Sequence, residues 1–188
     1  MNYSIPVRSL AFAIHGAAKN DVRYYFNAVR VSGTDCTATN GRMMLRIRDD
    51  AQVALEPLLI PRDAVEWAIK AAKTAKAHVV DIARAGRDLT LEVGGQSLRA
   101  TAVEDRWPDV DLIVPQAYEP QLPAAYNPDL LAQFAKAAKA VGKGVGVRIM
   151  PRDGGSVVDF PGALVPCFGV IMPLRDTVDT PVTFAEAK

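Results

Sequence analysis

The stretch that decides the fold is DVRYYFNAVRVSGTDCTATNGRMMLRI, residues 21–47. Between 22 and 28 the even-numbered residues fall on one side and the odd-numbered residues on the other, which predicts a strand with one buried face. Residues 32–35, SGTD, predict a hairpin turn, and a second strand is expected up to Thr39. Asn40-Gly41 predicts a tight turn that needs a positive φ, and Met43 to Ile47 resumes an extended run.

The same order of elements recurs on both sides of this stretch. Helices are expected at 10–19, 63–77 and 128–141, with Asp63 capping the second, and Asn127 and Pro128 starting the third. Residues 115–123 contain three prolines and predict a linker. The pattern is a strand, a helix and about three strands, repeated three times, which predicts an α+β fold. The remaining strands are expected near 3–8 and at 58–60, 78–83, 88–93, 97–103, 145–150, 156–160 and 168–174.

Four stretches resemble one family, the bacterial sliding clamps, which are the beta subunit of DNA polymerase III. They are DVRYYFN with ATNGRMML (21–27 and 38–45), LLIPRDAVEWAIK (58–70), EDRWPDVDLIVP (104–115) and VIMPLR (170–175). All four occur in the order of the family and are spread over most of residues 10–175. The resemblance implies a sliding-clamp architecture of about three βαβββ units, with helices on one face of antiparallel sheets.

The resemblance also divides the chain. Residues 1–116 match the middle domain of a clamp, which has two βαβββ units, and 117–175 match the second half of its last domain. Residues 176–188 form a C-terminal tail beyond the usual end of the family. The chain thus resembles a shortened clamp, and because rings of this family contain more units than one such chain supplies, we expect a homo-oligomer.

Composition limits the function classes. The chain has 188 residues, 49% hydrophobic and 23% charged, with a formal net charge of +1. Contact with nucleic acid therefore requires a local arrangement of charge. Cys36 and Cys167 are expected to be free thiols in a reducing compartment. The sequence shows no signal peptide and no apolar run near the ~18 residues of a membrane span, which favours a cytoplasmic protein.

Cationic side chains gather on the expected helices. On a helical wheel the lysines of the third helix lie opposite its apolar stripe, whereas those of the second helix drift towards its apolar side. The acidic residues of these two helices are Asp63, Glu66 and Asp129. Flexible lysines suit sequence-independent contact with phosphates. A solvated lysine face is the alternative; the resemblance, in which such helices line a DNA channel, favours DNA. The candidate DNA-binding residues are Arg8, His15, Lys19, Arg62, Lys70, Lys73, Lys76, Lys136, Lys139 and Lys143.

The resemblance further implies a groove that receives short linear motifs of polymerases and clamp loaders. Methionines and aliphatics suit an adaptable apolar groove, although the same residues also suit an ordinary core. Three positions depart from the family: Asn40 stands where Asp is usual, Arg42-Met43 where His-Arg is usual, and Leu112 where Arg is common. We therefore expect a more apolar groove. Its candidate residues are Phe26, Thr39, Gly41, Arg42, Met43, Met44, Pro108, Leu112, Ile113, Val170, Ile171, Met172, Pro173, Leu174 and Arg175.

Enzymatic and metal sites are not expected. The two histidines and two cysteines lack metal-ligand spacing, and neither cysteine has a recognisable nucleophile context. The glycine-rich stretch 142–146 follows a helix and lacks the phosphate-loop pattern. Glu104-Asp105 with Asp109 and Asp111 fits a turn better than a cation site. We expect no cofactor and no catalysis.

The sequence therefore predicts a sliding clamp-like processivity factor for DNA replication. It would encircle or track duplex DNA through its helices and tether a polymerase through the groove. The alternative is a clamp-derived adaptor or decoy that binds peptides and never encircles DNA. The number of subunits, the identity of the partner and the role of the tail are not determined by the sequence.

Overall fold

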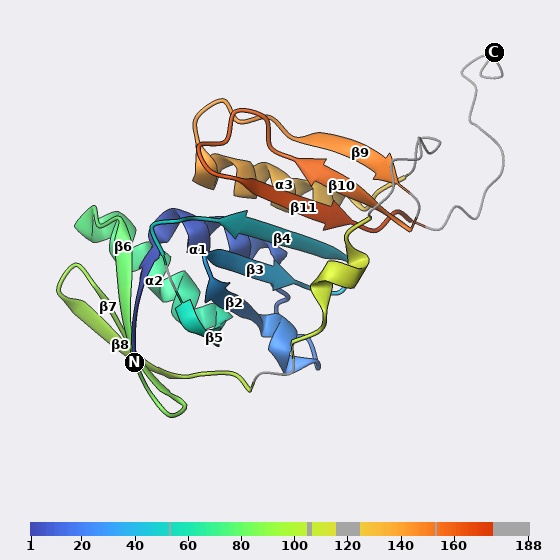
Figure 1. Ribbon diagram of the computed structural model, residues 1–188. Helices are drawn as coiled ribbons and strands as arrows, with labels where there is room; N and C mark the ends of the chain where they lie inside the picture. Colours follow the sequence, from blue (N-terminus) through green and yellow to red (C-terminus); the bar gives the residue numbers. More distant parts are fainter. Residues whose placement is uncertain (53, 105–106, 116–124, 153, 175–188) are drawn as a thin grey trace, which may run out of the picture.

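The computed structural model describes residues 1–52, 54–104, 107–115, 125–152 and 154–174. They form two antiparallel sheets and a layer of helices (Figure 1). The strands are β1 (Asn2–Pro6), β2 (Ala28–Gly33), β3 (Asp35–Thr39), β4 (Met43–Arg48), β5 (Ala54–Pro61), β6 (Val79–Ala85), β7 (Asp88–Val93), β8 (Gln96–Thr101), β9 (Arg148–Arg152), β10 (Gly155–Asp159) and β11 (Cys167–Ile171). The helices are α1 (Val7–Ala13), α2 (Arg62–Ala75) and α3 (Pro128–Val141), with 3-10 turns η1 (Ile14–Gly16), η2 (Tyr24–Asn27) and η3 (Val110–Ile113).

The repeated units exchange strands. One sheet has four strands in the order β1-β6-β7-β8, and the other has seven in the order β5-β2-β3-β4-β11-β10-β9. The first strand of each of the first two units thus pairs within the other unit's sheet, which interlocks them. The third unit joins through β4 and β11, in register from Met43 opposite Ile171 to Ile47 opposite Cys167. No strand directly precedes α3 in the described part of 115–127.

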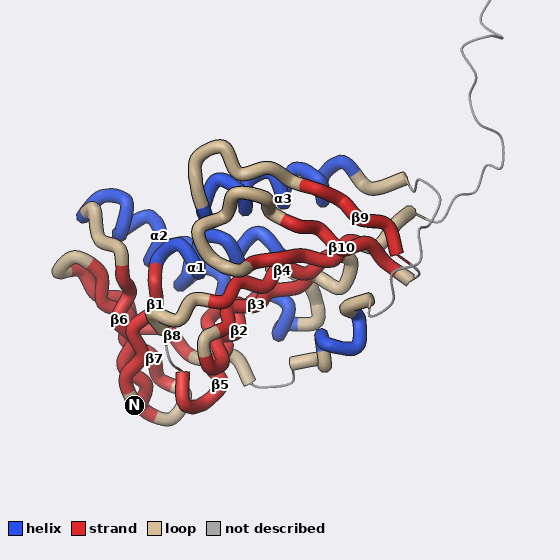
Figure 2. Tube along the Cα trace, turned by 45° about the horizontal axis from the view of Figure 1, so that its top comes forward, coloured by secondary structure: helices blue, strands red, loops and turns tan. Residues whose placement is uncertain are grey.

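The α-helices form one layer. α1 packs against both α2 and α3, and Figures 1 and 2 show the helices together on one side of the seven-stranded sheet. Aromatic rings fill the space beneath them: Phe12 meets Phe160 edge-on at 5.0 Å between centroids, and Phe134 lies 6.3 Å from the same ring. The predicted α+β architecture, with helices on one face of antiparallel sheets, is confirmed.

The third helix has the predicted start and end. It begins at Pro128, the Asn127 side chain accepts a hydrogen bond from the Asp129 amide at 2.8 Å, and it ends at Val141. The second helix differs, because Pro61 and not Asp63 occupies its N-cap. Pro61 has a φ of −53° and ends β5, so the chain turns directly into the helix and Asp63 falls in its first turn.

The prediction of a strand over 22–28 is wrong. Residues Tyr24–Asn27 form η2, and β2 starts at Ala28. The side chain of Asp21 accepts a hydrogen bond from the Arg23 amide at 2.8 Å. Asn27 exchanges hydrogen bonds with the Asp21 backbone, at 2.8 and 2.9 Å. These local side-chain bonds give the backbone an alternative to the extended ladder.

Other predicted boundaries also differ from the structure. The helix predicted at 10–19 is α1 at Val7–Ala13 followed by η1, so His15 and Lys19 lie beyond the α-helix. The chain turns closely against β3 there, since a Cβ on Gly16 would lie 2.6 Å from the carbonyl oxygen of Ala38. In the third unit, β9 starts only at Arg148 and β11 ends at Ile171.

Candidate nucleic-acid and partner surfaces

The helix layer carries the lysines of the described residues. These side chains are exposed, and they lie on α2 and α3 or directly after a helical turn. Every salt bridge within the described ranges uses an arginine, so the lysine charges are not neutralised by neighbouring acids there. We define this lysine face by Lys19, Lys70, Lys73, Lys76, Lys136, Lys139 and Lys143.

Acidic side chains on the α-helices lie near the helix starts. Asp63 and Asp129 are in first turns, and Glu66 pairs with Arg62 at 2.9 Å. The helix dipole favours this order of acids and lysines. The result is that a chain of net charge +1 concentrates positive charge on one layer and carries most of its described acids on strands and loops.

The two candidate arginines of the helix layer are engaged within the protein. Arg8 donates to the buried carboxylate of Asp49 from Nε at 2.6 Å and from Nη2 at 2.9 Å. The Arg62 guanidinium donates to the carbonyl oxygens of Ile14 at 3.1 Å and Ala17 at 2.7 Å. These contacts hold α1 to the β4–β5 loop and α2 to η1, so both arginines have a structural role.

His15 marks the place where the three helices meet. Burial lowers the pKa of its imidazole, the charges of Lys136 and Arg62 lower it further, and a hydrogen bond with Gln133 opposes them. The imidazole is therefore neutral at pH 7 and adds no positive charge there. η1 contacts both α2 and α3, so the part of α2 at Arg62 and the part of α3 at Lys136 both lie near His15.

The segments predicted to form the groove come together. β4 pairs with β11, and beyond the paired region the Met172 amide donates to the carbonyl oxygen of Arg42 at 2.9 Å. Figure 1 shows η3 beside the start of β4, away from the helix layer. We call the contact made there the outer-face cluster: Met44, Val110 and Val170 are buried, with Trp107, Ile113, Val114, Phe168 and Met172 around them.

Strand alternation divides the predicted groove residues between two faces. Met43 and Ile171 lie in the core beneath the helices, whereas Met44 and Val170 face the outer-face cluster. Arg175 lies outside the described residues. The others are placed as follows: Phe26 and Thr39 are buried; Pro108, Ile113 and Met172 are half-buried; Gly41, Arg42, Leu112, Pro173 and Leu174 are exposed.

An ion pair that the sequence analysis missed fixes η3 on the sheet. Arg46 Nη1 lies 2.6 Å from Asp111 Oδ1, and its guanidinium carbon lies 5.8 Å from the Phe168 ring centroid. The Asp109 carboxylate accepts a hydrogen bond from the Asp111 amide at 3.1 Å. These acids therefore cap and anchor η3. The described residues contain no group of three or more His, Cys, Asp and Glu side chains placed to hold a metal ion.

Both cysteines are free thiols. Cys36 is buried and its thiol donates to Gln52 Oε1 at 3.4 Å. Burial raises the pKa of Cys36 to about 12 and that of the half-buried Cys167 to about 11. Neither environment activates a nucleophile. Within the ranges described, no helix has the length and apolar character needed to cross a membrane.

Comparison with known proteins identifies the fold. No protein-family model and no curated protein matches the sequence. Among solved structures, the chain is similar to the DNA polymerase sliding clamp of Pseudomonas aeruginosa, with TM-score 0.71, 17% identity, and 93% of this chain and 67% of that chain covered. It is also similar to a DnaN sliding clamp from Bartonella birtlesii bound to griselimycin, with TM-score 0.74 and 13% identity, and to the Caulobacter crescentus beta sliding clamp, with TM-score 0.69 and 13% identity. Each of these two matches covers 93% of this chain and 66% of the clamp chain.

These matches confirm the resemblance at the level of the fold. The chain has the sliding-clamp fold and spans about two thirds of the length of the clamps it matches. Sequence identities of 13–17% to these structures extend the likeness to the fold alone.

Proposed function

We propose that this chain is a sliding clamp-like processivity factor that holds duplex DNA against its helix layer without reading its sequence. The lysine face carries the proposal, because it gathers uncompensated ammonium groups on one side of a nearly neutral protein. Flexible point charges bind phosphates in many registers, which is what sliding contact requires. The protein acts by binding and not by catalysis, in the cytoplasm and as a homo-oligomer.

The outer-face cluster is the proposed site for a linear motif of a polymerase or clamp loader. Met172 is half-buried beside the exposed Leu174 and Pro173, and Leu112 is 82% exposed on η3. An apolar peptide side chain packing here would cover this surface, and Arg42 would hold polar groups of the peptide. The helix layer lies on the other side of the seven-stranded sheet, so both ligands can bind together.

The DNA proposal is tested by neutralising Lys136, Lys139 and Lys143 together to Gln. Binding of a short duplex is measured by fluorescence anisotropy between 50 and 300 mM salt. Binding weakens with salt, so the slope of log K against log salt is negative. Each lost phosphate contact reduces the magnitude of this slope by about 0.9, so the three substitutions should reduce it by up to about 2.7.

The matched control neutralises Arg48, Arg87 and Arg148, which are exposed on strands and loops and already paired with acids. It changes the net charge by the same amount and should leave the slope nearly unchanged. Equal losses in the two variants would show that binding follows net charge and would refute the helix layer as the DNA surface.

The groove proposal is tested with a labelled apolar peptide from a bacterial replicative polymerase. Met172→Asp should abolish binding because the peptide would have to desolvate a carboxylate. Val147→Asp, at a site 40% exposed and outside the outer-face cluster, is the control. Peptide binding without any DNA binding by the unmodified chain would favour the adaptor or decoy over the processivity factor.

A further inference from the structure

The strand β8 is an edge without the usual protection. The edge strands of the two sheets are β1 and β8 in one, and β5 and β9 in the other. Prolines stand in the other three: Pro6 in β1, Pro57 and Pro61 in β5, and Pro151 in β9. Proline on an edge opposes pairing with another chain. The sequence of β8, QSLRAT, has no proline, and no other described strand than β7 pairs with it, so its outer edge can accept an added strand.

The hairpin before β8 fixes which of its backbone groups are free. Gly94 and Gly95 both have positive φ, 56° and 80°, which is the two-residue turn that closes on a hydrogen-bonded pair, here Val93 and Gln96. The alternation continues to Ala102, whose amide donates to Arg87 at 2.7 Å. The amides and carbonyls of Ser97 and Arg99 therefore point away from β7, towards the open edge.

The fold already contains one junction of the kind that this edge would form. β4 and β11 are the last strands of the first and third units, and they pair antiparallel. β8 is the last strand of the second unit, and among the described strands it pairs with β7 alone. A second copy of the chain would supply a matching strand.

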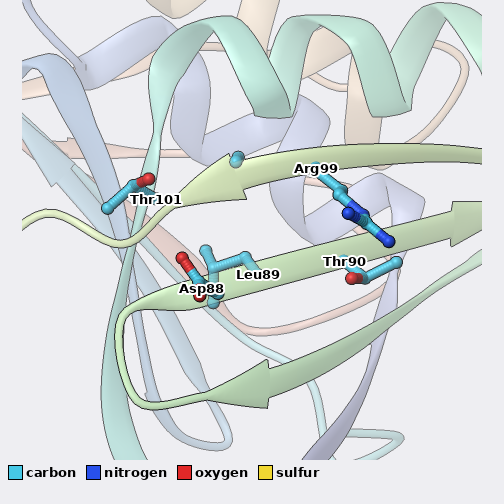
Figure 3. Close-up of a pocket in the computed structure, with 6 residues that line it drawn as sticks. Asp88, Leu89, Thr90, Arg99 and Thr101 are labelled. Carbon is cyan, nitrogen blue, oxygen red and sulfur yellow. The ribbon is translucent and has the colours of Figure 1, made fainter.

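Charges beside the edge favour such a partner. Asp81 and Glu92 lie directly opposite each other on β6 and β7, an unfavourable like-charged pair, and Glu92 forms no ion pair within the described residues. Arg99 is likewise without an acid partner there. Figure 3 shows Arg99 beside Thr90 of β7, on the face of the sheet away from α2. The neighbour of Glu92 across the hairpin is Ser97, at the open edge.

We propose that β8 pairs antiparallel with β8 of a second copy, about a two-fold axis at Leu98. Ser97 of each copy then lies opposite Arg99 of the other, and their free amides and carbonyls hydrogen bond. Each Arg99 guanidinium reaches past Ser97 to Glu92 of the other copy. A register centred on Arg99 would instead place two guanidinium groups opposite each other.

Apolar side chains lie on the other face of the sheet at the same place. A cleft of about 410 Å3 at β8 is lined by Trp67 of α2, Leu98 and Ala100, together with the polar Asp63, Arg99 and Thr101. In this register Leu98 packs on its own copy, and the half-buried Trp67 lies close to the axis. Because the axis is perpendicular to the sheet, both helix layers lie on the same side, which extends the lysine face. The pairing rests on the homo-oligomer of the proposed function and assigns its interface, and it does not require DNA.

Light scattering and analytical ultracentrifugation of the full chain test the pairing. We expect a mass twice the 20.2 kDa of one chain. Arg99→Glu and Glu92→Arg should each weaken the dimer about tenfold, since the contact between Arg99 and Glu92 occurs twice about the axis. The combined swap should restore the dimer. Arg87→Glu is the charge-matched control. A monomeric chain, open to a strand of another protein, or a swap that fails to restore the dimer, would overturn the proposal.

Cross-linking tests the register separately. In a Cys167→Ser background, Leu98→Cys should form an intermolecular disulfide, because a non-hydrogen-bonded antiparallel pair brings Cα atoms to about 4.5 Å. Gln96→Cys should not, since its own copy lies roughly 13 Å away along the strands at ~3.3 Å per residue. Cross-linking at 96 and not at 98 would contradict the assigned axis.

Discussion

Replacing Gly169 by alanine tests how the third unit is joined to the first. Gly169 lies in β11, opposite Leu45 of β4 and below α3. A Cβ there would lie 2.5 Å from Phe134 Cε1 and 2.8 Å from the carbonyl oxygen of Met44. Phe134 is fully buried and Met44 belongs to the β4–β11 ladder, so neither can move away without disturbing the core or the strand pair.

The expected loss follows from this overpacking. A methyl group forced into a closed site costs about 1–3 kcal/mol. For a chain of this length each kcal/mol lowers Tm by about 2–4 °C, so Gly169→Ala should lower Tm by about 2–12 °C. Thermal and urea unfolding followed by circular dichroism measure it.

The control is Gly155→Ala, one strand away in β10. Its added Cβ would meet neighbours at 3.4–3.7 Å, ordinary contact distances, so its Tm should change little. If Gly169→Ala proved as stable as Gly155→Ala, then α3 would not pack on β11 as described. The continuity of the helix layer across the units would lose its support.

Two further predictions concern buried polar groups. Hydrogen bonds from Arg8 hold the pKa of Asp49 below its ordinary value, so the pair stabilises the fold above about pH 4 and loses this effect as pH falls through the lowered pKa. Asp49→Asn should lower the free energy of unfolding by roughly 2 kcal/mol at pH 7, less than the loss of a fully buried pair because Arg8 is 43% exposed. The urea midpoint of the variant should also fall less between pH 5 and 2 than that of the unmodified chain. An unchanged acid dependence would contradict this role. The raised pKa values of Cys36 and Cys167, about 12 and 11, predict slow alkylation by iodoacetamide at pH 8, rising about a hundredfold or more in denaturant, as measured by mass spectrometry. Rapid labelling of folded Cys36 would show that its site is open.

Local sequence signals predicted helices and turns best where a side chain fixes the end of the element. Asn127-Pro128 placed the start of α3 because cap and proline act within one turn. Gly41, with a φ of 81°, marked a turn that needs a left-handed backbone. The same kind of local bonding misled the prediction over 22–28, since Asp21 and Asn27 bind each other and not the ladder.

Long-range pairing was not predictable from one sequence. Nothing in the letters of β11 indicates that it pairs with β4, so the assignment of Met43 to the core and of Met44 to the outer-face cluster appeared only in the structure. Likewise, Arg8 and Arg62 fit the cationic pattern of the helices, but their acceptors, Asp49 and the carbonyls of η1, lie on other segments. Within the described ranges, the lysines of α2 and α3 form no such ion pairs or hydrogen bonds and remain exposed.

Amine footprinting tests most directly whether DNA lies on the helix layer. The protein is acetylated briefly with and without saturating duplex DNA, and each amine is quantified by mass spectrometry. The amine of Met1, which donates to the Arg84 carbonyl at the end of β6, serves as the internal reference. We predict strong protection of Lys70, Lys73, Lys136, Lys139 and Lys143 with no change at Met1; equal reactivity of these lysines with and without bound DNA would contradict the central claim.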